Sequence, residues 1–283
     1  MIKIKQIHDT IINDTNTVTP TDFPDGTKLI KYYLDKDFIN EATITWLYDN
    51  DSELFQLIAL TQHLKAKGVQ VTLNMPYVPN ARMDRVKSDD EVFTLKYFAQ
   101  VINWLGFKNV KIANPHSTVS EALFERVIVD FDCVREDVMN ILFGLPDITR
   151  FNADVLFFPD AGALKRYGDL FKDLDIPFAY GEKNRDWKTG KILGLNVIAN
   201  GVDLNGKKVL VIDDISSKGT TFVKSAEKLK QLGCEDVCLY ITHCENTIFD
   251  GDILKDNNLI TKVYTTNSII RREHKKIEIV RTF

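Results

Sequence analysis

Two adjacent carboxylates, Asp213 and Asp214, follow the apolar run Val209–Ile212, at a position where a buried strand would end. Beyond Ile215 the residues are small, hydroxyl-bearing or cationic and lead into a helical pattern: Ser216, Ser217, Lys218, Gly219, Thr220 and Thr221. Backbone N–H groups at a helix start bind phosphate, whereas carboxylates repel it. The acids suit sugar hydroxyls or a cation instead, so the stretch predicts a sugar-phosphate site. The alternative is that the two acids only cap a turn.

Two further segments place charged side chains after apolar runs. In MPYVPNARMDR, Arg82 and Arg85 flank Asp84 and offer charge-assisted donors for polyphosphate oxygens. In IANPHST, His116 follows the end of another apolar run. Taken singly, the first segment is typical of a solvated charged loop and the histidine of a structural residue, so neither is specific by itself.

Asp160 and a lysine–arginine pair complete the candidate residues. Asp160 follows the apolar run of VLFFPDAGALKR and precedes small residues, so its carboxylate can reach a cation such as Mg²⁺, which prefers oxygen ligands. Lys183 and Arg185 lie in the charged stretch AYGEKNRDWKTGKILG. A mobile loop with two cations can close over a transferring phosphoryl group and neutralise its charge. The alternative is a solvated hairpin, because Lys-Thr-Gly-Lys is good turn chemistry.

Apolar, β-branched runs alternate with helical patterns and must position these residues. The expected strands are EATITWLYD, VQVTLNMPY, NVKIAN, DVLFFP, KKVLVIDD, EDVCLYITH and TKVYTTN. Helical spacing is clear over residues 52–68 and 219–233, and each of these segments has a glycine at its end. The alternation predicts an α/β fold of two doubly wound, mostly parallel-sheet domains, over residues 1–147 and 148–283. Ligands of such sheets bind at the carboxyl ends of the strands, where the candidate residues fall. In the charged tail Arg271–Arg281, KKIEIV is a possible edge strand, and we expect the cations of the tail to form a solvated face and not a site.

The composition is that of a globular protein, since 44% of the 283 residues are hydrophobic and 27% are charged. A net charge of −4 gives no reason to expect nucleic acid or an acidic membrane as a partner. No apolar run approaches the ~20 residues of a membrane span, and MIKIKQIHDT lacks the apolar centre of a signal peptide. The four cysteines show no zinc-type spacing. We therefore expect a cytoplasmic protein with reduced thiols.

VLVIDDISSKGTT resembles the phosphoribosyl-binding loop of type I phosphoribosyltransferase folds and, more narrowly, of ribose-phosphate pyrophosphokinases. FPDGT, MPYVPNARMDR, IANPHST, VLFFPDAGALKR and KNR resemble further segments of that second family, in the same order along the chain. The resemblance covers most of the chain, from about residue 23 to about residue 264. It implies a phosphoribosyltransferase-type fold and a magnesium-dependent diphosphotransferase that uses ATP.

The resemblance also implies a role for each matching residue. ATP binding is implied for Phe23, Asp25, Arg82, Met83, Asp84 and His116. Binding of the sugar phosphate is implied for Asp213, Asp214, Ser216, Ser217, Lys218, Gly219, Thr220 and Thr221. Mg²⁺ ligation is implied for His116 and Asp160, and catalysis for Lys183, Arg185 and Arg82. Phe23 and Asp25 match residues that serve the site of a neighbouring subunit, which implies a homo-oligomer, either a dimer or a hexamer.

The sequence departs from the family pattern at several positions. Thr27 replaces a glutamate, Met83 a glutamine and Ala163 a glycine, and the N-terminal segment is too short and polar for the family's full opening strand and helix. In the sugar-phosphate loop, Asp-Thr-Gly-Gly-Thr has become Ser217-Lys218-Gly219-Thr220-Thr221. That loop has lost an acid and gained the cation Lys218. A larger acceptor than ribose 5-phosphate, such as ADP-ribose, is therefore an alternative substrate, with a role in NAD metabolism.

The implied reaction transfers the β,γ-diphosphate of Mg–ATP to the anomeric hydroxyl of ribose 5-phosphate and releases AMP. Three other functions stay open. A phosphoribosyltransferase would need only the loop at 209–221, without the arginine and histidine segments. An inactive regulatory relative would be expected to lose catalytic cations, and Lys183 and Arg185 argue against it. A generic nucleotide-binding module is the third.

Overall fold

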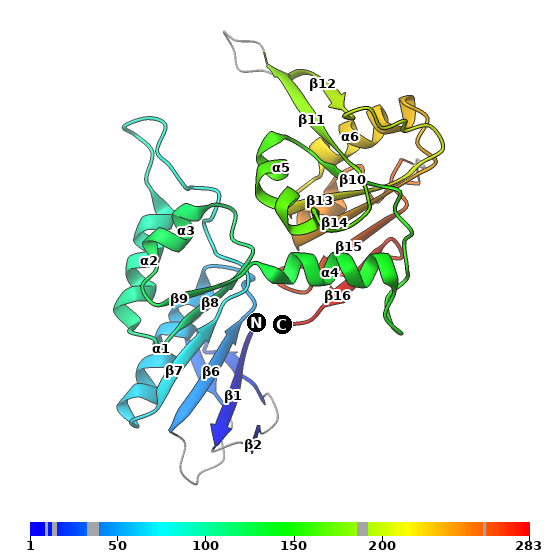
Figure 1. Cartoon of the computed structure of the whole chain (residues 1–283). Coiled ribbons are helices and arrows are strands. Elements are labelled where there is room, and N and C mark those ends of the chain that lie inside the picture. Colours follow the sequence, from blue (N-terminus) through cyan, green and yellow to red (C-terminus); the bar gives the residue numbers. More distant parts are fainter. Residues whose placement is uncertain (9–10, 13–15, 33–39, 186–191, 257–258) are drawn as a thin grey trace. The chain divides into compact units, whose positions relative to one another are not determined.

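The computed structural model describes residues 1–8, 11–12, 16–32, 40–185, 192–256 and 259–283. It divides into two compact units, Met1–Phe131 and Asp132–Thr282, with Phe283 assigned to the first. Each unit is built on a seven-stranded sheet that is mostly parallel (Figure 1). Every expected strand is present, so the α/β prediction is confirmed.

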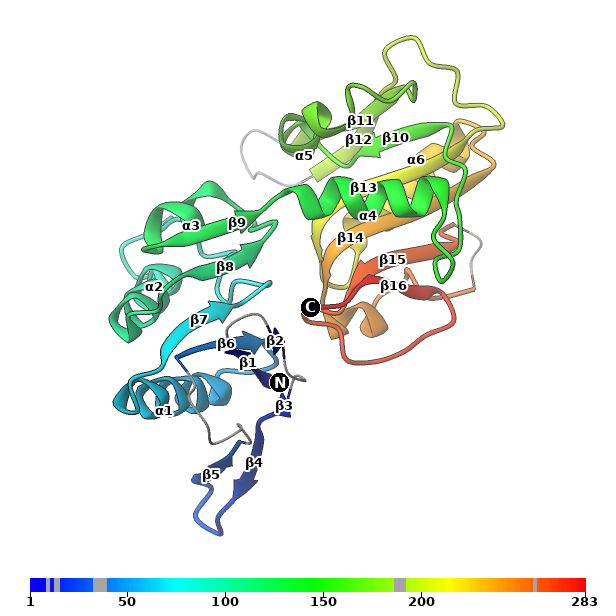
Figure 2. The same ribbon diagram turned by 60° about the horizontal axis from the view of Figure 1, so that its bottom comes forward.

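The first sheet has the strand order β2–β1–β6–β7–β8–β9, and β3 also pairs with β1. Strands β6 to β9 are parallel, whereas β1 is antiparallel to β6. The hairpin β4–β5 forms a separate two-stranded sheet, which extends away from the first sheet in Figure 2. The elements of this unit are β1 Ile2–His8, β2 Ile11–Ile12, β3 Asn16–Thr17, β4 Thr19–Asp22, β5 Lys28–Lys31, β6 Glu41–Trp46, α1 Ser52–Ala66, β7 Gln70–Asn74, α2 Thr94–Leu105, β8 Val110–Ala113, α3 Thr118–Leu123 and β9 Val127–Asp130.

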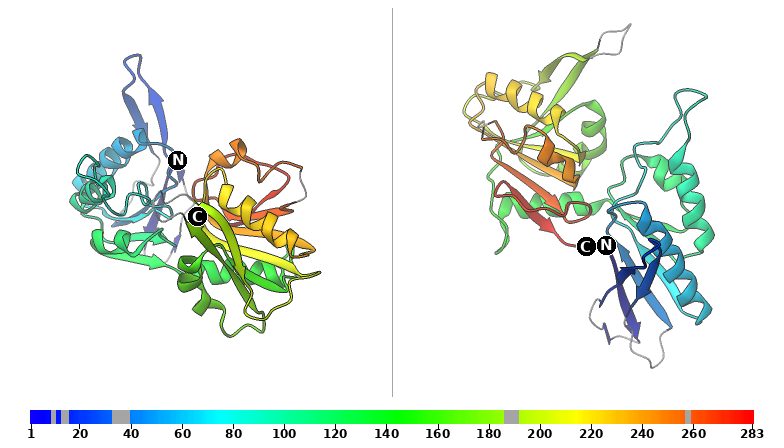
Figure 3. Two further views of the ribbon diagram at one scale, coloured as in Figure 1. Left: turned by 90° about the horizontal axis from the view of Figure 1, so that it is seen from above. Right: turned by 180° about the vertical axis from the view of Figure 1, so that it is seen from behind.

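The N-terminal segment contributes buried apolar side chains to the first sheet, although its composition is polar. Ile2 and Ile4 alternate with lysines along β1 and are buried against the first sheet, at 3% and 0% exposure. Helices α1 and α2 lie on this sheet (Figures 1 and 3), and α1 buries Leu57, Leu60 and Leu64 in the same core. This hydrophobic core holds the carboxyl ends of β7 and β8 in place, where the arginine and histidine segments begin.

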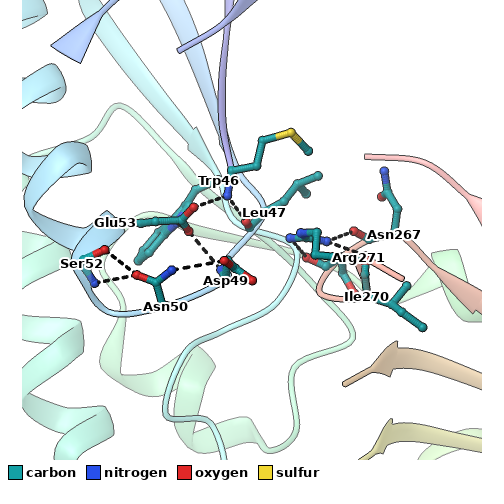
Figure 4. A network of polar contacts seen from close by, with 11 residues as sticks. Trp46, Leu47, Asp49, Asn50, Ser52, Glu53, Asn267, Ile270 and Arg271 are labelled. Atoms are coloured by element: carbon teal, nitrogen blue, oxygen red, sulfur yellow. Dashed lines mark hydrogen bonds and ion pairs between the residues drawn. The ribbon is translucent and has the colours of Figure 1, made fainter. Parts of the chain in front are cut away.

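A buried carboxylate fixes the turn between β6 and α1. Glu53 accepts hydrogen bonds from the indole Nε1–H of Trp46, at 2.9 Å, and from the backbone N–H of Asp49, at 3.0 Å (Figure 4). The side-chain oxygen of Asn50 accepts from the backbone N–H of Ser52, at 3.1 Å. Because a buried carboxylate needs such donors, these bonds set where the helix starts.

The second sheet has the strand order β12–β11–β10–β13–β14–β15–β16. Only β12 runs antiparallel to its neighbour. The register is continuous across the centre of the sheet, with Val155 beside Val209 and Val209 beside Val237. The elements of this unit are α4 Asp132–Phe143, β10 Val155–Phe158, α5 Ala161–Tyr167, the 3-10 helix η1 Gly168–Phe171, β11 Phe178–Arg185, β12 Ile192–Ile198, β13 Lys208–Ser216, α6 Thr220–Gln231, β14 Asp236–Cys244, the 3-10 helix η2 Asn246–Asp250, β15 Lys262–Thr266 and β16 Ile277–Arg281.

Helices cover both faces of the second sheet. Phe222, Ala226 and Leu229 of α6 share a core with Val209 and Val211, which point to one face of β13. On the other face, Phe158 of β10 stacks on Tyr167 of α5, with ring centroids 6.5 Å apart. The central strands are apolar on both sides, as parallel strands between two helical layers must be.

Helix α4 belongs to the second unit, although we expected the boundary near residue 147. The Arg135 guanidinium pairs with both carboxylate oxygens of Asp173, at 2.8 and 2.7 Å. It also donates to the Leu170 carbonyl of η1. The division into compact units therefore falls before α4, at residue 132, because this helix packs on η1 and β16.

The cations of the C-terminal tail are engaged in structure, although we expected a solvated face. On the edge strand β16, Arg281 Nε lies 2.8 Å from Asp137 Oδ1, and Arg281 Nη2 lies 2.6 Å from Glu136 Oε2. Arg271 donates to the backbone carbonyls of Asn267 and Ile270, at 2.8 Å each (Figure 4). The expected edge strand in KKIEIV is confirmed, and its arginine ties the edge of the sheet to α4.

Asp137 is fully buried, and it gives the second unit a pH-dependent stability. Burial raises the pKa of its carboxyl to about 6 from 3.8, against the opposing effects of Arg281 and of the Tyr240 hydroxyl, 2.8 Å away. Between pH 4 and 6 the folded protein therefore holds a proton that the unfolded chain has released. This group's contribution to the free energy of unfolding falls as pH rises through that window, by about 3 kcal/mol at most, and is constant above it.

The prediction is tested by measuring urea unfolding from pH 4 to 7 for the wild type and for Asp137→Asn. The difference between the two free energies of unfolding should change with pH between about 4 and 6 and then level off. Asp173→Asn is the control, because its exposed carboxylate has a lowered pKa and should produce no slope there. A pH-independent difference for Asp137→Asn would contradict the assignment.

The four cysteines, Cys133, Cys234, Cys238 and Cys244, are all buried, and none of them forms a disulfide. Burial raises the pKa of Cys238 and of Cys244 to about 12, which makes these thiols poor nucleophiles.

Among the described residues, no helix has both the length and the apolar character needed to span a membrane.

Candidate active site

The carboxyl edge of the second sheet brings three predicted acids together. In the register of β10 and β13, Phe157 lies beside Val211, so the residues after β10 run alongside the end of β13. Asp160 follows β10, and Asp213 and Asp214 lie near the end of β13. Asp160 also caps α5, because its Oδ1 accepts from the backbone N–H of Ala163 at 3.0 Å. The fold therefore places this carboxylate beside the paired acids.

The three carboxylates repel one another. Burial, and after it the charge of Asp214, raises the pKa of Asp213 well above its usual value, and the charge of Asp160 adds to the effect. Asp214 itself is buried, at 7% exposure. A ligand that donates hydrogen bonds, or a cation, would relieve this repulsion. The acids predicted from the sequence to bind a sugar or a cation therefore lie close together at this edge.

A tight loop follows these acids and starts α6. Gly219 has a φ of +78°, in the left-handed region that favours glycine, and its carbonyl accepts the helical bond from Val223 at 3.0 Å. A Cβ on Gly219 would lie 1.9 Å from Ile253 Cδ1, so the packing also demands glycine. The first N–H groups of an α-helix have no partner within the helix, which leaves the loop and helix start suited to an anion.

Strand β11 brings the backbone of the two predicted catalytic residues to the same edge. Phe158 lies beside Tyr180, so β11 continues past the end of β10 with Lys183 and Arg185. A Cβ on Gly181 would lie 2.5 Å from the Pro159 carbonyl oxygen, which shows how closely the two strands approach there. We expected both residues in a loop, with a hairpin as the alternative, and their backbone belongs to a β-hairpin with β12. Residues 186–191 of the predicted catalytic loop lie outside the described residues.

The predicted ATP residues Arg82, Met83, Asp84 and His116 gather at the carboxyl edge of the first sheet. The segment with Arg82 follows β7 and His116 follows the neighbouring strand β8. The two connections are joined by a backbone bond from Ala113 N–H to the Pro76 carbonyl, at 3.0 Å. Arg82 is exposed, while Met83, Asp84 and His116 are half-buried. These residues therefore lie where an α/β sheet presents its ligand-binding edge.

The hairpin β4–β5 holds the other predicted ATP residues. Phe23 is 49% exposed at the tip, and Asp25 accepts from the backbone N–H of Thr27, at 3.0 Å, and from its hydroxyl, at 2.7 Å. These bonds lower the pKa of Asp25. Thr27, which replaces the family's glutamate, thus holds the Asp25 carboxylate in place through these two hydrogen bonds. The exposed aromatic ring suits contact with a ligand or with another subunit.

Sequence reasoning did not identify the residues that support the sugar-phosphate loop from behind. The segment after β14 packs on this loop: a Cβ on Gly251 would lie 1.9 Å from the Lys218 carbonyl oxygen. Thr247 contacts Ser217 at 2.9 Å between the hydroxyl oxygens, and Glu245 N–H donates to the Ser216 carbonyl at 2.9 Å. The only signal in the sequence was the polar cluster Glu245–Thr247 at the end of an apolar strand.

Comparison with known proteins places this geometry in a family. Residues 135–256 match the family model described as the phosphoribosyl transferase domain. The ribose-phosphate pyrophosphokinase of Thermococcus kodakarensis is 27% identical over 250 residues, which cover 87% of this chain and 84% of that protein. The enzyme of the same name from Sulfolobus acidocaldarius is 27% identical over 265 residues, which cover 91% of this chain and 86% of that protein.

A solved structure shares the fold of the whole chain. The phosphoribosylpyrophosphate synthetase of Mycobacterium smegmatis superposes with a TM-score of 0.69 at 18% identity, over 94% of this chain and 86% of that chain. The sequence relatives align with 87% and 91% of this chain, so the similarity extends over both units. The chain is therefore similar over most of its length to ribose-phosphate pyrophosphokinases, and it has the phosphoribosyltransferase fold.

Proposed function

We propose that the protein transfers the β,γ-diphosphate of Mg–ATP to the anomeric hydroxyl of ribose 5-phosphate, giving phosphoribosyl diphosphate and AMP. One observation supports this most strongly: the second sheet gathers an acid pair and an anion-binding loop at a single edge, on neighbouring residues of one strand and one helix. Acids beside an anion site suit a ligand that is a polyol at one end and a phosphate at the other.

The sugar phosphate would be held by two kinds of contact. Asp213 and Asp214 accept hydrogen bonds from ribose hydroxyls, which relieves the repulsion that raises the pKa of Asp213. Backbone N–H groups from Lys218 to Thr221 bind the 5-phosphate at the start of α6. In the reaction, the anomeric oxygen forms a bond to the β-phosphorus of ATP. The bond between the β-phosphorus and the oxygen that bridges it to the α-phosphorus breaks, so AMP leaves with that oxygen. The proton of the anomeric hydroxyl is released to solvent.

Positioning and charge neutralisation would supply the rate enhancement. Arg82, Lys183 and Arg185 are the cations that we assign to the polyphosphate. Such groups stabilise the transition state of phosphoryl transfer without covalent help from the protein. The buried thiols of Cys238 and Cys244, with their raised pKa values, are not suited to act as nucleophiles. We assign Phe23, Asp25, Met83, Asp84 and His116 to the nucleotide.

Asp160 and His116 are the residues that we assign to Mg²⁺. The crowded carboxylates at the second sheet edge fit a hard cation, because a positive charge there would offset their repulsion. Among the described residues no cluster of three or more His, Cys, Asp or Glu side chains has a metal-binding arrangement. Mg²⁺ usually keeps waters and substrate phosphates as ligands, and these would complete the coordination. When bound, Mg²⁺ supplies charge neutralisation at the phosphates.

The proposal is tested by incubating the protein with Mg–ATP, with and without ribose 5-phosphate, and measuring AMP. We expect AMP to form only when both substrates are present, in equal amount to the phosphorylated sugar product. AMP that appears only when a nucleobase is also consumed would favour a phosphoribosyltransferase. Binding of both ligands without any AMP would favour the regulatory relative.

A larger acceptor, ADP-ribose, is the second candidate substrate, and one observation favours it. Lys218 is exposed while its carbonyl packs against Gly251, so an additional cation lies on the open side of the sugar-phosphate loop. Such a cation suits an acceptor with more than one phosphate. A diphosphate gained by ADP-ribose and not by ribose 5-phosphate, measured by product mass, would select this candidate.

We also propose that the protein acts as a homo-oligomer, because Phe23 is exposed on a protruding hairpin.

A further inference from the structure

A chain of hydrogen bonds behind the sugar-phosphate loop fixes the orientation of one hydroxyl in that loop. The Thr247 hydroxyl donates to Glu245 Oε2, at 3.0 Å, and its oxygen lies 2.9 Å from the hydroxyl oxygen of Ser217. A threonine hydroxyl has one proton, and a carboxylate only accepts. Because Thr247 gives its proton to Glu245, the Ser217 hydroxyl must donate to Thr247. Ser217 then has only acceptor capacity left for a ligand.

We propose that Glu245 and Thr247 are positioning residues. They orient the Ser217 hydroxyl so that it accepts a hydrogen bond from a sugar hydroxyl and does not donate one to phosphate. A ligand group that pairs with Ser217 must carry its own proton, and a phosphate dianion carries none there. The 5-phosphate is thereby left to the backbone N–H groups that follow Ser217. This assignment of the sugar hydroxyl to Ser217 and of the 5-phosphate to the backbone N–H groups rests on the proposed function, since both lie within the same ribose phosphate site.

The surrounding packing holds this chain of bonds in register with the loop. The backbone N–H of Glu245 donates to the Ser216 carbonyl, at 2.9 Å, so β14 ends directly beside the loop. The absence of a side chain at Gly251 lets the Lys218 carbonyl approach the segment after η2. Glu245, Thr247 and Ser217 are each half-buried, so the bonds form in partly excluded solvent, where their direction matters more than in water.

The inference also explains how the loop functions without the acid that the family has at position 217. Glu245, directly after β14, supplies a carboxylate two hydrogen bonds away from Ser217. The Ser217 hydroxyl then accepts a hydrogen bond from the sugar without placing a negative charge beside the phosphate. The loop therefore keeps an acceptor for the sugar while lowering repulsion toward a phosphorylated ligand.

The test uses the full-length protein and titration calorimetry with two probes, ribose 5-phosphate and inorganic phosphate. Thr247→Val removes the acceptor that orients Ser217, and Ser217→Ala removes the hydroxyl itself. Each should raise the Kd for ribose 5-phosphate about 3- to 10-fold, the range expected for one hydrogen bond. The double variant should be no weaker than either single variant, because both changes break the same unit. Neither should weaken the binding of inorganic phosphate.

Two controls separate this role from a general loss of structure. Thr247→Ser keeps the hydroxyl and should restore the wild-type Kd. Thr261→Val makes the matched change at the opposite end of the sheet, where its hydroxyl bonds to Asp236, and should leave both affinities unchanged.

Weakened phosphate binding in Ser217→Ala, or additive effects in the double variant, would overturn the inference while leaving the proposed function intact. A wild-type Kd for ribose 5-phosphate in Thr247→Val would do the same. A wild-type protein that binds no ribose 5-phosphate would overturn the proposed function, and this inference with it.

Discussion

Replacing Lys183 with alanine should lower kcat by about 100- to 1,000-fold while the Kd for ATP changes little. Strand β11 extends past β10 and carries the backbone of residue 183 to the edge where Asp160 and the acid pair lie. A cation delivered there would act on the phosphoryl group in transit and not on the bound nucleotide at rest. The loss of one preorganised charge-stabilising group has an effect of this size on turnover.

The measurement is steady-state AMP release together with ATP titration calorimetry. Lys172→Ala is the matched control, because that lysine is exposed and pairs only loosely with Asp169, at 3.9 Å. It should retain the wild-type rate. Turnover of Lys183→Ala close to that of the control would remove Lys183 from the catalytic assignment. A large loss of ATP affinity with unchanged kcat would show that it binds the nucleotide in the ground state.

Replacing Asp214 with asparagine should weaken ribose 5-phosphate binding by about 10- to 100-fold and leave ATP binding nearly unchanged. The substitution keeps the shape of a buried side chain and removes the negative charge of the group that accepts hydrogen bonds from the sugar hydroxyls. Hydrogen bonds to charged groups contribute about 1.5–3 kcal/mol, which corresponds to that range. It should also lower the pKa of Asp213, because the repulsion from its neighbour is gone.

The two dissociation constants can be measured separately by calorimetry. Asp154→Asn is the matched control: its carboxylate accepts from the Lys208 backbone N–H, at 2.8 Å, at the opposite end of the same strands. It should leave both constants at their wild-type values. The reverse pattern for Asp214→Asn, with ATP binding lost and sugar phosphate binding kept, would mean that the two half-sites are wrongly assigned.

Local patterns were sufficient to predict the central strands and the acids at their ends. The run Val209–Ile212 is apolar on both faces, so it predicts a central parallel strand, and the positions of Asp213 and Asp214 follow directly. Asp160 was predicted for the same reason. The position of a candidate residue could therefore be predicted where that residue is adjacent in sequence to the strand that positions it.

Contacts between distant residues could not be predicted in this way. Arg281 looked solvated because its neighbours are charged, yet its partner Asp137 is 144 residues away. Lys183 and Arg185 lie in a polar run without strand alternation, so turn chemistry indicated pairing with β12 only as an alternative to a loop. The contact of Thr247 with Ser217 depends on how the chain turns after β14, across 30 residues. Tertiary packing decides each of these cases.

Transfer of an intact diphosphate is the central claim, and ³¹P nuclear magnetic resonance of a single reaction tests it most directly. The sample would contain the protein, Mg–ATP and ribose 5-phosphate. The account predicts that the ATP signals are replaced by the single resonance of AMP and by two coupled resonances of a new diphosphate ester, in equal amounts. ADP with a singly phosphorylated sugar, or inorganic phosphate released by hydrolysis, would contradict it.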